Sequence, residues 1–161
     1  MKTMKTMKTK IASMFVIIMY IVTVAACNKD DNNNSEQNTT LQQTETTAQS
    51  GSWKVTYFFD TDQDETNHFT GYTFTFNENG SLVAVNGSTT ITGTWSVTDS
   101  NSSDDDGGST SPDFNIFFAS PPDFEDLSDD WDIISVSNSK IELTDVSGGN
   151  GGTDFLTFEK I

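Results

Sequence analysis

The side chains of this 161-residue chain that could carry out chemistry are few in kind, although acids are abundant. His68 is the only imidazole, Cys27 is the only thiol, and the chain contains no arginine. With no thiol in the folded part of the chain, a cysteine–histidine pair is unavailable, and with no arginine, an arginine clamp is unavailable as well. A serine–histidine–aspartate triad can be drawn only because serine and aspartate are common, and His68 lies in a polar connection. We therefore expect that the protein is not an enzyme.

A second candidate chemistry is calcium binding. Asp60, Asp62 and Asp64 place carboxylates at alternate positions, as the ligands of calcium loops do. Such loops need glycine at position six and a bidentate glutamate at position twelve, where this chain has Glu65 and Gly71. The departures favour a solvated loop between strands, and we expect no metal or other cofactor.

The N-terminal residues have the pattern of an export signal. Residues 1–10 carry four lysines and no acid, and the sixteen residues 11–26 are uncharged. A helix that spans a bilayer needs about 20 apolar residues, and this run is shorter. It ends in Val24-Ala25-Ala26-Cys27, which resembles a bacterial lipobox. The resemblance implies cleavage before Cys27 and its acylation (palmitate-type chains), which anchors the protein in the membrane; the alternatives are a plain cleaved signal and an uncleaved anchor.

The residues after Cys27 refine this location. The stretch Asn28-Lys29-Asp30-Asp31 is similar to the lysine-plus-acids export signal of surface lipoproteins of the Bacteroidota. The resemblance implies that Lys29, Asp30 and Asp31 direct a lipid-anchored outer-membrane protein to the cell surface. In the alternative, these residues begin a hydrophilic linker and the protein faces the periplasm.

The charge of the exported part excludes one class of partner. From Cys27 onward, four lysines stand against all 24 acids, a net charge of −20. Because binding to phosphate requires its neutralisation by lysine or arginine, we expect no nucleic-acid partner.

Composition also divides the chain into parts. Residues 28–50 contain only Leu41 and Ala48 as apolar side chains, which is too little to offset the entropy of ordering, so we expect disorder there. The expected organisation is a lipoprotein signal peptide at 1–26, an acylated cysteine and disordered tether at 27–50, and a β-barrel domain at 51–161.

The folded part shows the period-two alternation of half-buried strands. Asn79-Gly80 and Asn86-Gly87 are tight-turn signals between strands, and 122–129 is the one helical candidate. Eight strands are expected, at 52–59, 72–77, 82–85, 91–97, 114–118, 131–136, 141–146 and 154–160.

Short connections favour an all-β, antiparallel, up-and-down meander, and closing it into a barrel removes the exposed edges. An immunoglobulin-like sandwich is the alternative, with fewer strands and longer crossovers. The domain resembles bacterial lipocalin-like families. The stretches that carry this likeness are Gly51-Ser52-Trp53, Thr73-Phe74-Thr75-Phe76 with Asn79-Gly80, Gly93-Thr94-Trp95-Ser96-Val97, 131–133, 140–143 and 156–160.

The likeness has consequences for the barrel interior. Lipocalins lay an arginine over the first-strand tryptophan, and Lys160 could take that place over Trp53. The resemblance implies a small apolar ligand inside the barrel, whereas large inward residues favour a filled barrel whose surface binds a protein partner. Phe58 and Phe117 are out of phase with the alternation of their neighbours, which indicates either an exposed patch or strand ends under the loops. The candidate ligand-binding residues are Trp53, Tyr57, Phe74, Phe76 and Trp95.

Overall fold

The computed structural model describes residues 32–99, 112–146 and 152–161. Antiparallel strands form a closed eight-stranded barrel, so the predicted all-β meander is confirmed. From β3 to β9, neighbouring strands in the sheet are consecutive in the chain, as the short turns predicted. The strands are β1 (Trp53–Asp60), β2 (Gln63–Asp64), β3 (Thr73–Phe76), β4 (Ser81–Asn86), β5 (Thr89–Thr98), β6 (Asp113–Phe117), β7 (Asp129–Val136), β8 (Lys140–Val146) and β9 (Thr153–Lys160).

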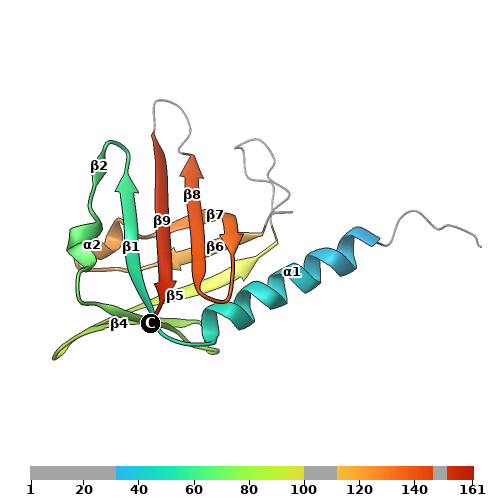
Figure 1. Ribbon diagram of the computed structural model, residues 1–161, viewed down its shortest axis with the longest axis horizontal. Coiled ribbons are helices and arrows are strands. Elements are labelled where there is room, and N and C mark those ends of the chain that lie inside the picture. Colours follow the sequence, from blue (N-terminus) through green and yellow to red (C-terminus); the bar gives the residue numbers. More distant parts are fainter. Residues whose placement is uncertain (1–31, 100–111, 147–151) are drawn as a thin grey trace, which may run out of the picture.

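The barrel closes between its first and last strands. β1 pairs with β9 from Trp53 opposite Lys160 to Phe59 opposite Phe155. On its other side, β1 pairs with β3 only through Trp53 and Phe74, while the short β2 merely extends β1 as a hairpin outside the ring. Strands β1, β8 and β9 run across β4 and β5, which form the opposite wall (Figure 1). The single pair between β1 and β3 leaves a seam that other elements must fill.

Two tight turns join strands where the sequence indicated them. In the β3–β4 turn, the Gly80 amide donates to the Asn77 carbonyl oxygen at 3.0 Å, and Gly80 has φ of 78°. Gly87, between β4 and β5, has φ of 59°. Both glycines are in the left-handed region that other residues enter at a cost, so the two turn predictions are confirmed.

A β-bulge in β1 corrects one expectation about the interior. Val55 lies opposite Phe158, but Tyr57, two residues on, lies opposite Thr157, so β1 carries one extra residue. The extra residue reverses the alternation of faces. Tyr57, expected inside, is 40% exposed on the outer surface, and Phe58 is buried in its place, at 1%.

The segment before the barrel also differs from expectation. The tether predicted to be disordered is helical over α1 (Asn32–Gln49). Leu41 packs against the core, and Thr44 and Ala48 are buried, a spacing that places all three on one helix face. The Trp53 indole nitrogen donates to the Ala48 carbonyl oxygen at 2.8 Å and so ties the helix end to β1. Across the described ranges, no helix is both long and apolar enough to span a bilayer.

Two short helices fill the seam between β1 and β3. These are the 3-10 helix η1 (Thr66–Phe69) and α2 (Pro122–Glu125), the latter being a shorter form of the predicted helix. Phe69 of η1 and Phe124 of α2 meet edge to face, with ring centroids 5.3 Å apart. Because Phe69 also packs edge to face on Phe58 at 5.5 Å, these rings cover the place where β1 leaves β3.

Candidate functional site

The interior of the barrel is the first place to look for a site, and aromatic side chains occupy it. Trp53 and Phe74 are 0% exposed, Phe76 is 1% exposed and Trp95 is 6% exposed. Four of the five predicted ligand-binding residues therefore lie together in the core. Phe76 contacts Trp95 edge to face, with ring centroids 5.2 Å apart, and also contacts Phe114 at 5.5 Å. Such ring pairs stabilise a packed core beyond the burial of their area.

The polar atoms of the buried tryptophans are already occupied by the protein. The indole nitrogen of Trp95 donates to the Asn77 carbonyl oxygen at 3.0 Å, and that of Trp131 donates to the Leu127 carbonyl oxygen at 3.1 Å. In the described part of the chain, every buried side-chain nitrogen and oxygen has a hydrogen-bond partner. The interior therefore offers no free donor there to orient a ligand.

The predicted contact between Lys160 and Trp53 is confirmed. The Lys160 ammonium lies 5.5 Å from the centroid of the Trp53 ring, within the range of a cation–π contact. Its Nζ also donates to Ser50 Oγ at 2.8 Å. A Cβ at Gly51 would come within 2.5 Å of Lys160 Cε, so a larger residue there would push the flexible end of the lysine side chain aside. Lysine here takes the place that the lipocalin resemblance assigns to arginine, and with α1 it closes one end of the barrel.

The fifth predicted residue, Tyr57, belongs to a different surface. Its ring stacks on that of Phe59 on the outside of β1, with centroids 6.4 Å apart and planes at 18°. Phe59 lies opposite Phe155 of β9. Sequence reasoning missed this outer cluster because the bulge that creates it shows in the sequence only as the irregular phase of Phe58, which does not tell which rings face outward.

Carboxylates gather at the far end of β1. Oxygens of Asp60, Glu65 and Asp126 all lie within 4.8 Å of one another, and His68 Nδ1 is 3.7 Å from Glu65. Burial raises the pKa of the Asp126 carboxyl, and the charges of Asp60 and then Asp123 raise it further. Oxygen ligands of this kind suit a hard divalent cation.

This cluster is not the loop that the sequence suggested. It includes Asp60 but neither of the other two alternating aspartates, Asp62 and Asp64. The Asp64 carboxylate instead accepts from the Thr66 amide at 3.0 Å and so caps the turn into η1. Asp60, Asp62 and Asp64 therefore do not come together as the ligands of a calcium loop would.

Among the described residues, two of the hollows on the outer surface of the barrel lie near sequence features noted above. One, of about 530 Å³, lies over β5, β6 and the start of β7, and includes Phe117, Ser128 and Asp129 in its lining. Phe117 is 58% exposed, in keeping with its irregular phase in the sequence. Burial raises the pKa of Asp129 to about 7, and its hydrogen bond with Asp130 contributes to the rise. The other hollow, of about 660 Å³, lies beside the β3–β4 turn.

The residues of the predicted lipid anchor and export signal, Cys27, Lys29, Asp30 and Asp31, lie outside the described residues. The fold therefore defines a class of protein, a closed antiparallel barrel with a filled interior. The predicted anchor and export signal stay predictions from the sequence.

Comparisons with known proteins add little to this class. No family model matches the chain, and no curated protein matches it. Among solved structures, a DUF4847 family protein from Bacteroides vulgatus is similar to this chain with 16% sequence identity and a TM-score of 0.44. The similarity covers 70% of this chain and 93% of that one.

Proposed function

We propose that this protein is a non-catalytic interaction module, held at the outer membrane by a lipid on Cys27 and displayed on the cell surface. The barrel serves as a rigid scaffold, and its outer surface makes the contacts with a protein partner. The alternative role, storage of a small apolar ligand within the barrel, would need space where the core side chains now lie.

The observation that carries the proposal is the packing of the interior. The ring of Phe158 packs edge to face on both Phe74 and Phe76, with centroids 5.4 Å apart in each pair. Phe124 and Phe69 cover the seam in the wall. An eight-stranded barrel is only just wide enough to hold either side chains or one small ligand, and here side chains occupy the space.

The surface supports the same reading. Negative charge of this density keeps an exported domain soluble and apart from anionic lipid headgroups and nucleic acid. The lipobox-like stretch that ends at Cys27 and the acids that follow it support display at the cell surface. Helix α1, docked through Ala48, gives the barrel a defined orientation on its tether.

The interior is tested with a fluorescent fatty-acid analogue titrated into the purified chain. Trp53, Trp95 and Trp131 serve as energy donors to any probe that enters the barrel. A filled core predicts no saturable binding of the probe at micromolar concentrations. A micromolar dissociation constant would correspond to a binding free energy of about −8 kcal/mol. Saturable one-to-one binding, competed by unlabelled fatty acid, would overturn the proposal in favour of a carrier.

The lipid anchor and the display at the cell surface are tested separately in cells. Cys27 should incorporate labelled palmitate, and Cys27→Ala should move the protein out of the membrane fraction. Replacing Lys29, Asp30 and Asp31 by alanine should protect the barrel from protease added to intact cells while leaving acylation unchanged. An alanine variant of Cys27 that stays unprocessed in the membrane would show instead that the leader is a permanent anchor.

A further inference from the structure

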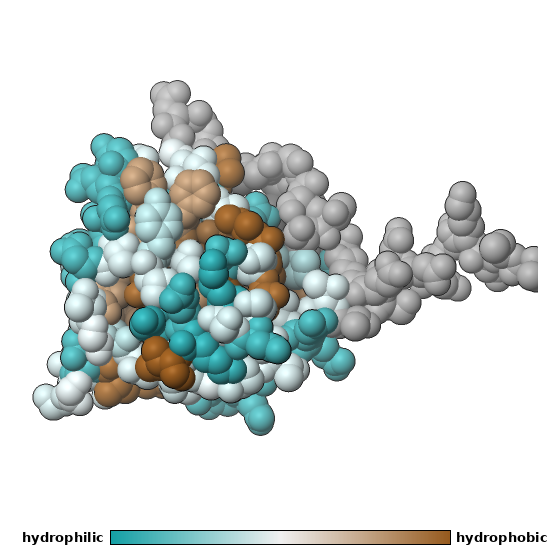
Figure 2. Space-filling model, viewed as in Figure 1, coloured by the Kyte–Doolittle hydropathy of each residue, from teal (hydrophilic) through white to brown (hydrophobic). Residues whose placement is uncertain are grey.

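Apolar side chains collect on the outside of the barrel, over β1, β9 and β8, where a solvated wall should be polar. We define the outer aromatic patch as Tyr57, Phe59, Phe155 and Val146. Tyr57 and Phe59 are stacked, and Phe59 lies opposite Phe155. Tyr57 is 40% exposed and Val146 is 58% exposed, whereas Phe59 and Phe155 are half-buried. Brown, hydrophobic side chains are visible together on this face in Figure 2.

The bulge in β1 creates the patch. The buried neighbours of its aromatic members, Phe58 and Leu156, point into the core, so Tyr57, Phe59 and Phe155 must point outward. Leaving this area in water has no structural benefit to the barrel. Contiguous exposed apolar area with a polar border is typical of an interaction site.

Carboxylates border the patch at both ends of one cross-strand row. Reading across neighbouring strands from β2 to β7, the paired residues are Asp64, Phe59, Phe155, Thr144 and Asp132. Residues directly opposite on paired strands share a face. With neighbouring strands about 4.8 Å apart, the four steps from Asp64 to Asp132 follow about 19 Å of the curved barrel surface.

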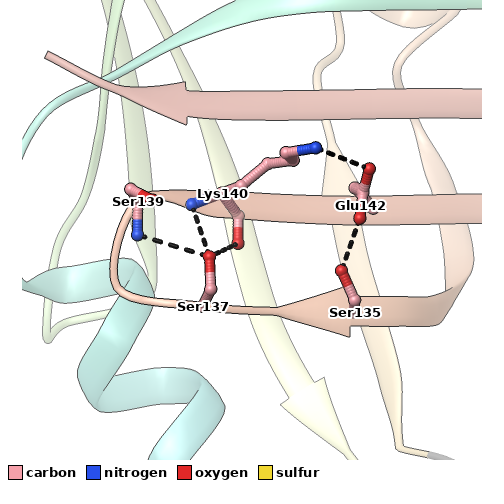
Figure 3. A network of polar contacts seen from close by, with 5 residues as sticks. All are labelled: Ser135, Ser137, Ser139, Lys140 and Glu142. Atoms are coloured by element: carbon pink, nitrogen blue, oxygen red, sulfur yellow. Dashed lines mark hydrogen bonds and ion pairs between the residues drawn. The ribbon is translucent and has the colours of Figure 1, made fainter.

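The cations of the described residues lie elsewhere. Lys140 is bound to Glu142 at 3.0 Å, in the network around the β7–β8 turn that Figure 3 shows. Lys160 lies over Trp53, and Lys54 lies opposite Glu159 near the same end of the barrel. The row from Asp64 to Asp132 therefore keeps its negative charge, with aromatic rings in the middle.

We propose that the outer aromatic patch docks a basic amphipathic segment of a partner protein, with cationic residues meeting Asp64 and Asp132 and apolar residues covering the rings. The inference rests on the proposed interaction role and names the partner's chemistry. Exposed aromatic faces attract lysine and arginine as well as apolar groups. The charge of the border repels anionic lipid and nucleic acid, so a protein segment is the complementary occupant.

The geometry also specifies the segment. A path of about 19 Å over a curved wall suits an extended segment, in which about six residues cover that length at about 3.3 Å per residue. A probe peptide can therefore be built: an extended peptide with two lysines about six residues apart, leucines at alternate positions between them, and a fluorescent label. A matched peptide carries glutamine in place of each lysine.

The test measures fluorescence anisotropy of each peptide with the purified chain at two salt concentrations. The lysine peptide should bind saturably and more weakly at higher salt. Tyr57→Ser combined with Phe155→Ser should weaken binding at least tenfold, and so should Asp64→Lys combined with Asp132→Lys. The control combines Phe117→Ser on β6 with Glu78→Lys in the β3–β4 turn, and its affinity should be unchanged. Asp132→Lys alone removes no packed side chain and leaves the hydrogen bond between Asp64 and the Thr66 amide intact, so it decides the matter if either double variant unfolds.

Several outcomes would overturn the inference. They are no saturable binding of the lysine peptide, equal affinity for the glutamine peptide, and wild-type affinity in the charge-reversal variant. Patch-dependent binding to vesicles of neutral phosphatidylcholine, without peptide binding, would assign the patch to a lipid surface instead. The fatty-acid titration of the interior is independent of these variants, so the failure of either proposal is distinguishable from that of the other.

Discussion

Phe124 offers the sharpest test of how the barrel is filled. Its ring, 2% exposed, closes the seam between β1 and β3 and packs on four other rings. The centroid distances are 5.0 Å to Tyr72, 5.1 Å to Phe118, 5.3 Å to Phe69 and 6.0 Å to Phe74. Replacement by alanine removes all four contacts and leaves a cavity between elements far apart in the sequence.

The expected cost is large compared with the stability of a domain of this size. Truncation of a buried phenylalanine to alanine costs about 3–5 kcal/mol. The four ring contacts place Phe124→Ala in the upper part of that range, because such pairs add about 0.5–1.5 kcal/mol each beyond burial. A total stability of about 5–15 kcal/mol would fall by about a quarter or more. Phe117→Ala removes the same ring from a side chain that is 58% exposed, and should cost below about 1 kcal/mol.

The measurement is urea denaturation of both variants, followed by tryptophan fluorescence. Trp131 is a suitable reporter because its indole nitrogen binds the Leu127 carbonyl oxygen just after α2. Phe124→Ala should lower the unfolding midpoint without changing the denaturant dependence. If Phe124→Ala costs no more than Phe117→Ala, α2 does not close the seam and the account of a filled interior is wrong.

Three further predictions concern single positions. The pKa of Asp129 is raised from 3.8 to about 7 in the fold, so the folded state binds the extra proton and stability should fall as pH rises from about 4 to 7. Asp129→Asn should flatten this pH dependence and raise the unfolding free energy at pH 8 by on the order of 1–2 kcal/mol, after discounting for partial exposure. Parallel plots of unfolding free energy against pH for the wild type and the variant from pH 4 to 8 would contradict this prediction. A Cβ at Gly93 would lie 2.6 Å from Phe118 Cδ1, so Gly93→Ala should lower the free energy of unfolding by about 1–3 kcal/mol or more, as measured by thermal unfolding. An unchanged unfolding free energy would disprove the close packing of β5 on β6. Ala48→Glu places a charge at a fully buried position and should release α1, seen as faster amide exchange in the helix and quicker proteolysis before Trp53, whereas unchanged protection would refute the docking.

Much of the fold was readable because each strand obeys a local rule. The alternation in residues 72–77 and 91–97 reappears as β3 and β5, since side chains of a half-buried strand must alternate between core and water. The turns at Gly80 and Gly87 were equally readable, because a positive φ restricts the residue type. Lys160 over Trp53 followed from the lipocalin resemblance, and the pairing of β1 with β9 brings the two side chains together.

Helix α1 was missed although its signal was present. Leu41 and Ala48, the two apolar side chains of the segment, are seven residues apart and hence on one helix face. Composition argued for disorder, because so few apolar groups cannot stabilise an isolated helix. The stabilising partner is the barrel end, where Trp53 reaches the Ala48 carbonyl, and no local pattern announces that contact.

The sequence by itself determined the strands, their turns and the closing of the barrel, because these depend on residue type and spacing along the chain. Only the tertiary structure decided which side of β1 each aromatic ring faces. One extra residue before Tyr57 moved Phe58 into the core and turned Tyr57 and Phe59 outward. A bulge depends on register with the neighbouring strand, so the proposed docking surface became visible only once β1 was paired with β9.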